Sequence, residues 1–109
     1  MPWYFYLLEF LAGALLANGV PHFVQGVSGN PFQSPFAKPP GVGESSAVVN
    51  VVWGFLNLVV GYFLICRVGE FDLRSSEQVA VLGLGILLTG VLTARGFGRF
   101  HGGNSPQDA

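Results

Sequence analysis

The stretch that decides the fold is AVVNVVWGFLNLVVGYFLIC, residues 47–66, which is twenty consecutive residues without a charge. An α-helix rises about 1.5 Å per residue, so twenty residues cover roughly 30 Å, the thickness of the hydrocarbon core of a bilayer. The stretch therefore predicts a membrane-spanning helix at about residues 46–66.

One side of this helix differs from the rest. Asn50, Gly54, Asn57 and Gly61 fall within an arc of about 60° when successive residues are placed 100° apart. Small residues let two helix backbones approach closely in a membrane, and carboxamides can hydrogen-bond across such a contact. This favours helix packing through Gly54 and Gly61, with the asparagines bonded to a neighbouring helix. The alternative is that the two asparagines line a polar path.

Two further apolar stretches predict helices at about residues 3–20 and 77–95. The first opens with four aromatic residues, which suit a membrane interface, and it should end or kink near residue 20, before a proline. A Pro/Gly/Phe-rich loop at 21–45, a polar hairpin at 67–76 and a polar tail at 96–109 account for the remaining chain. The fold class expected is an all-α integral membrane protein, a single membrane domain (1–109) with three transmembrane helices in a small bundle.

The composition supports this class and excludes others. Half of the 109 residues are apolar and 10% are charged, whereas about a quarter are charged in an average soluble domain. The net charge is −1 and the five basic residues form no cluster, so no footprint for nucleic acid is present. The partner expected first is the lipid bilayer.

Chemistry based on cysteine or metal finds little support in the sequence. Cys66 is the single cysteine, and we expect a buried, inert thiol at the end of its apolar stretch. His22 and His101 lie far apart without the spacing of metal ligands. We therefore assign no catalytic, cofactor-binding or metal-binding residue and expect no cofactor.

Small residues also mark one face of the first and third helices. Gly13 and Ala17 follow Glu9 at steps of four residues, and Gly83 and Gly90 share a face of the third helix. Three helices enclose little interior, so these helix-packing residues should also promote association with other molecules. We expect a homo-oligomer or a larger membrane complex.

Five polar residues form a candidate intramembrane polar site. Glu9 is the only acid within an apolar stretch, where it serves helix packing or, alternatively, proton or cation handling. Asn18 and His22 stand four residues apart near the end of the first helix. They either hydrogen-bond loop carbonyls or form a ligand-binding vestibule roofed by the loop. Asn50 and Asn57 complete the set if the two helices bring them together.

Three hypotheses about function follow, and they favour a non-enzymatic protein. The first is a helix-packing, oligomerising or partner-binding membrane component. The alternative is a small transporter or channel with Glu9 as the titrating group, and a weaker one is a membrane enzyme using His22 with Glu9 or Cys66. Arg95 and Arg99 flank the third helix, which favours a multi-pass protein of the cell's inner membrane with a cytoplasmic C-terminus.

Overall fold

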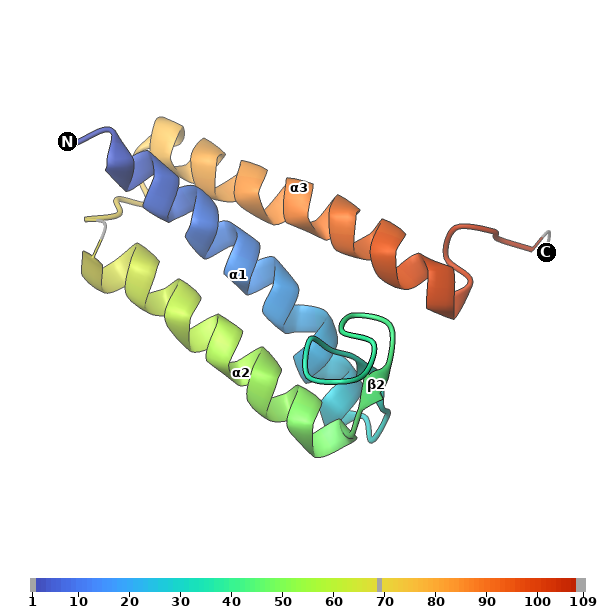
Figure 1. Ribbon diagram of the computed structural model, residues 1–109. Coiled ribbons are helices and arrows are strands. Elements are labelled where there is room, and N and C mark those ends of the chain that lie inside the picture. Colours follow the sequence, from blue (N-terminus) through green and yellow to red (C-terminus); the bar gives the residue numbers. More distant parts are fainter. Residues whose placement is uncertain (1, 69, 108–109) are drawn as a thin grey trace.

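The computed structural model describes residues 2–68 and 70–107, and three long helices dominate it (Figure 1). They are α1 (Tyr4–Val27), α2 (Ala47–Phe63), which continues into the π-helix η1 (Leu64–Val68), and α3 (Ser76–His101). All three are long and apolar enough to cross a membrane. The prediction of three apolar helices in a mostly helical chain is confirmed.

The helices form a single layer with α1 in the middle (Figure 1). α1 packs extensively on both α2 and α3, while α2 and α3 touch each other marginally at most among the described residues. α1 and α3 run in the same direction and α2 runs against them. The loop after α1 and the end of α3 therefore lie at one end of the layer, which we name the loop end, and the start of α1 lies at the opposite end.

Glycines and polar side chains, rather than large apolar ones, fill the contacts between the helices. Among the described residues, only Ala12, Phe32 and Ile65 are buried hydrophobic residues, whereas Glu9 and Asn50 are wholly buried. Large apolar side chains such as Leu87 and Leu92 point outward. This arrangement suits a bilayer, because lipid tails solvate apolar side chains and leave polar ones to the helix contacts.

α1 extends seven residues beyond its predicted end near residue 20, because Pro21 lies inside the helix instead of ending it. Proline removes one backbone hydrogen bond from a helix interior. An apolar span tolerates this loss, since leaving the helix there would expose many more backbone groups to lipid. The actual end is marked by Ser28, whose Oγ donates to the carbonyl of Val24 at 2.7 Å, and by Gly29 with φ +82°.

α3 also continues past its predicted end at about residue 95. It reaches His101 and ends at Gly102, whose φ of +80° is the left-handed geometry common after a helix. Gly98 lies inside the helix, against Asn104. The amide of Asn104 donates to the carbonyl of Arg95 at 2.8 Å, so the chain after Gly102 folds back along the last turns of α3.

Serine hydroxyls cap the starts of α2 and α3. Ser46 Oγ accepts from the backbone N–H of Val49 at 3.2 Å to begin α2. Ser75 Oγ accepts from the backbone N–H of Gln78 at 3.3 Å to begin α3. Each hydroxyl satisfies one of the N–H groups that have no partner at a helix start.

The loop between α1 and α2 folds back over the helix ends. Its two short strands, β1 (Phe32–Gln33) and β2 (Glu44–Ser45), pair antiparallel. The hydroxyls of Ser34 and Ser45 hydrogen-bond to each other. This pairing holds the buried ring of Phe32 against the helices, while Phe36 is exposed.

Candidate functional site

Asn50 is the centre of a buried polar network at the loop end. Its Nδ2 lies 3.1 Å from the backbone carbonyls of Phe32, Ser45 and Ser46. Its Oδ1 lies 2.7 Å from Nδ1 of His22. Because the Asn50 nitrogen faces carbonyls, its oxygen is the acceptor, so His22 Nδ1 carries a hydrogen and donates it. One side chain thus joins α1, the loop and α2.

A second polar pair joins α1 and α2 nearer the middle of the layer. Asn18 Nδ2 donates to Asn57 Oδ1 at 3.1 Å, and Asn57 Nδ2 donates to the carbonyl of Trp53 at 2.8 Å. The structure therefore brings together four of the five predicted polar residues, and both α2 asparagines form hydrogen bonds between helices.

Aromatic rings surround His22. The centroid of its imidazole lies 5.4 Å from Phe32, 6.4 Å from Trp53 and 5.7 Å from Phe97, all edge to face. Phe32 also packs 4.6 Å from Phe97 and stacks on His101 at 5.0 Å. These five rings, here named the aromatic cluster, tie the loop and the end of α3 to α1 and α2.

Sequence reasoning missed the α3 members of this cluster because it placed residues 96–109 in a polar tail. One signal was present, since Phe97 and His101 are four residues apart and share a helix face. His101 Nε2 lies 2.8 Å from Gln33 Oε1, which fixes the last turn of α3 to the loop.

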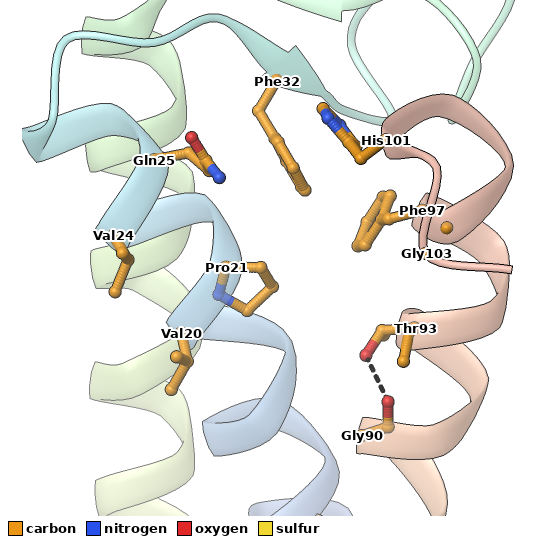
Figure 2. A pocket seen from close by; sticks show the side chains of 12 residues that line it. Val20, Pro21, Val24, Gln25, Phe32, Gly90, Thr93, Phe97, His101 and Gly103 are labelled. Atoms are coloured by element: carbon orange, nitrogen blue, oxygen red, sulfur yellow. Dashed lines mark hydrogen bonds between the residues drawn. The ribbon is translucent and has the colours of Figure 1, made fainter. Parts of the chain in front are cut away.

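Two cavities flank Phe97. The smaller, about 370 Å³, lies beside His22 under the loop and has Pro35 and Pro40 in its lining. The larger, about 430 Å³, lies between α1 and α3 at the loop end (Figure 2). Figure 2 shows Phe32 reaching into this space from the loop, with Val20, Pro21 and Val24 of α1 facing Thr93 and Phe97 of α3.

Glu9 stands apart from the network. It lies nine residues before Asn18 on α1, which is about 13 Å along the helix axis. Its side chain is wholly buried, and neither carboxyl oxygen has a hydrogen-bond partner among the described residues. Around the helix it lies between Ala12 and Gly13, which contact α2 and α3 respectively. Glu9 thus occupies the junction of the three helices.

The residues of the enzyme hypothesis do not converge. Glu9 and His22 are thirteen residues apart on one helix, or about 20 Å. Cys66 lies in η1, at the end of the layer opposite His22. The expectation of a buried thiol is wrong, since Cys66 is exposed. Within residues 2–68 and 70–107, no group of three or more His, Cys, Asp or Glu side chains is placed to hold a metal ion.

The predicted helix-packing residues divide into two groups. A Cβ on Gly54 would lie 2.5 Å from the backbone nitrogen of Phe23, and one on Gly61 would lie 3.0 Å from Leu16. Gly13 faces the backbone of α3 at Leu82 in the same way. These three sites permit close approach of α1 to its two neighbours.

The third helix uses a different glycine from the two predicted. Gly85 meets the carbonyl of Phe10, whereas a Cβ on Gly83 or Gly90 would have no atom within 4 Å. Gly90 lines the larger cavity, and Ala17 is half-buried on α1. Packing by Gly83 and Gly90 therefore stays a prediction about contacts with another molecule.

Comparison with known proteins adds no relative to these observations: no family model, curated protein or solved structure matches the chain.

Proposed function

We propose that this chain is a non-enzymatic component of a membrane complex that associates, with itself or with a partner, through the open face of α3. The observation that carries the proposal is the exposure of this helix. Only 6% of the apolar stretch of α3 is buried, against 28% for α1 and for α2.

The open face has the composition that helix contacts use in membranes. Ala80, Gly83, Gly90 and Ala94 fall within about 80° of arc, and both glycines lack neighbours within 4 Å of a Cβ position. Lipid solvates leucine as well as a protein does, so small residues matter chiefly where another backbone comes close. We assign this face to a helix of a second molecule, with a second copy as the simplest partner.

Gly83→Leu tests the assignment, because it fills the open face without touching the two cavities described above. Light scattering of the purified chain in mild detergent should show an oligomer that dissociates at least tenfold more readily in the variant. Gly96→Leu is the matched control: it makes the same exchange at a glycine with no neighbour within 4 Å, about 140° around the helix. A wild-type monomer at every concentration, unchanged by Gly83→Leu, would exclude self-association.

A second candidate function is a small transporter or channel with Glu9 as the titrating group. It is favoured by one observation, the wholly buried carboxyl whose two oxygens lack partners among the described residues. Such a group within a membrane helix is expensive and commonly functional. Glu9→Gln keeps the shape but cannot release a proton, so proton flux into proteoliposomes should stop. Glu77→Gln, at an exposed acid, is the control, and equal flux in wild type and Glu9→Gln would exclude this role.

We further propose that the protein lies in the cell's inner membrane with its C-terminus in the cytoplasm. Arg95 and Arg99 lie in the last turns of α3 at the loop end, together with Lys38. Arg67 and Arg74 lie at the opposite end, so the difference is one basic residue. A C-terminal green fluorescent protein should therefore fluoresce, while a C-terminal alkaline phosphatase should be inactive; the reverse pattern would invert the topology.

A further inference from the structure

The larger cavity lies where α1 and α3 are farther apart than at their glycine contacts. Gly13 of α1 lies against the backbone of Leu82 and Ile86, and Gly85 of α3 lies against Phe10. Toward the loop end no such glycine contact joins the two helices among the described residues, and a space of about 430 Å³ opens between them. This volume is in the range of small-molecule binding sites.

The aromatic cluster closes the cavity on the side of the loop. Phe32 and Phe97 pack with centroids 4.6 Å apart, and Phe32 stacks on His101 with an interplanar angle of 13°. His101 is in turn bonded to Gln33. The space is therefore framed by rings that hold one another in position, while its side stays open to the surroundings of the helices.

The walls are aliphatic and uncharged. Val20, Pro21 and Val24 of α1 line one side, and Gly90 and Ala94 of α3 line the other. No lysine, arginine or acidic residue is among the described residues that line the cavity. This lining favours a hydrocarbon chain and disfavours a charged ligand.

A single polar anchor lies near the closed side. Gln25 Oε1 accepts from Asn30 Nδ2 at 2.9 Å, which leaves Gln25 Nε2 as a donor with no partner among the described residues. Figure 2 shows this side chain extending from α1 toward Phe32. The hydroxyl of Thr93, deeper in the cavity, already donates to the carbonyl of Gly90 at 3.1 Å. An occupant near Gln25 should therefore present a hydrogen-bond acceptor.

Depth in the membrane identifies the acceptor. Gln25 is two residues from the end of α1, or about 3 Å along the axis, whereas Val20 is about 10 Å from that end. The donor thus lies at the border between hydrocarbon and headgroups, and the aliphatic walls lie below it. A bilayer lipid places its ester carbonyls and its acyl chains in this same order.

We propose that the cavity between α1 and α3 is a lipid site: one acyl chain of a diacyl phospholipid lies between the helices, and its ester carbonyl accepts a hydrogen bond from Gln25 Nε2. The site shares Gly90 and Ala94 with the α3 face assigned to association, whereas Gly83 belongs to that face and does not line the cavity.

The test uses the full chain in phosphatidylcholine vesicles that contain a trace of phosphatidylcholine with a photoreactive diazirine on one acyl chain. After illumination, mass spectrometry maps the labelled residues. Labels should concentrate on the lining residues of α1 and α3. An ether-linked probe, which lacks the carbonyl, should label them about threefold to tenfold less, the change expected for one hydrogen bond. This comparison needs no variant and so does not depend on one folding.

Two variants sharpen the result. In Gln25→Leu the ester and ether probes should label equally. Ala94→Phe should exclude both probes, while Leu92→Phe, at a 70% exposed position that lines no described cavity, should leave labelling unchanged.

Even labelling of every exposed helix face, or equal labelling of the wild type by both probes, would overturn the proposal. So would labelling that appears only in Gly83→Leu, since a second copy would then cover the cavity. A wild-type monomer with concentrated, ester-dependent labels would instead support the lipid site while excluding self-association.

Discussion

The two contacts of α1 are built differently. Against α2, glycines and two polar pairs, Asn18–Asn57 and His22–Asn50, hold the helices together along much of their length. Against α3, the close approaches through glycine seen among the described residues lie in one half, and the aromatic cluster joins the two helices at the loop end. Hydrogen bonds in a membrane add modest energy but fix register. α1 and α2 therefore form a fixed pair, to which α3 is attached more loosely.

The largest effect should come from filling the α1–α2 contact. Gly54→Leu places a Cβ 2.5 Å from the backbone nitrogen of Phe23 and 2.8 Å from the carbonyl of Gly19. Neither backbone atom can move without separating the helices, so the free energy of unfolding should fall by about 3 kcal/mol. Unfolding in dodecyl sulfate, followed by circular dichroism, measures it. Gly83→Leu is the matched control and should leave monomer stability within about 0.5 kcal/mol of wild type; equal losses in both variants would refute the distinction between the two glycines.

The next effect should come from the centre of the polar network. Asn50→Leu leaves the His22 N–H and the loop carbonyls without their side-chain partner, which should lower the free energy of unfolding by about 2 kcal/mol. Asn57→Leu removes one pair between helices and should cost about 1 kcal/mol in the same titration. The order of the two variants is the test. If Asn57→Leu is the more destabilising, the register of α1 and α2 depends on the middle of the helices and not on the loop end.

The sequence was sufficient to predict the three apolar helices, because the length of each apolar stretch and its lack of charged residues are visible in the sequence itself. It also indicated the face of α2 that carries Asn50 and Asn57, since that face is the polar exception on an apolar helix. The hydrogen-bond partners of those asparagines were harder to predict from the sequence. His22 pairs with Asn50 only because α1 continues as a helix through Pro21, and the lipid environment, rather than the local proline, decides that continuation.

α3 was harder to predict for a related reason. It is apolar nearly all round, so its sequence has several small-residue faces and nothing to rank them. The angle at which it crosses α1 selects Gly85, and that angle is a property of the whole layer. The positions of Phe97 and His101 on α3 were also not predicted, because the glycines inside α3 resembled the end of the helix.

The smallest effect should come from the polar link that joins α1 and α3 at the end opposite the loop. Tyr6 donates from its hydroxyl to Glu77 Oε2 at 3.0 Å, and the bond is exposed. An exposed bond of this kind exchanges with bonds to water or headgroups, so Tyr6→Phe should lower the free energy of unfolding by about 0.5 kcal/mol or less. The same dodecyl sulfate titration measures it, with Tyr4→Phe as the control because no hydrogen bond to Tyr4 is present among the described residues. A loss near 2 kcal/mol would mean that α3 is held to α1 by a strong polar contact at this end. The inference that α3 is attached to α1 more loosely than α2 is would then be wrong. The open face of α3 would belong to a rigid three-helix unit.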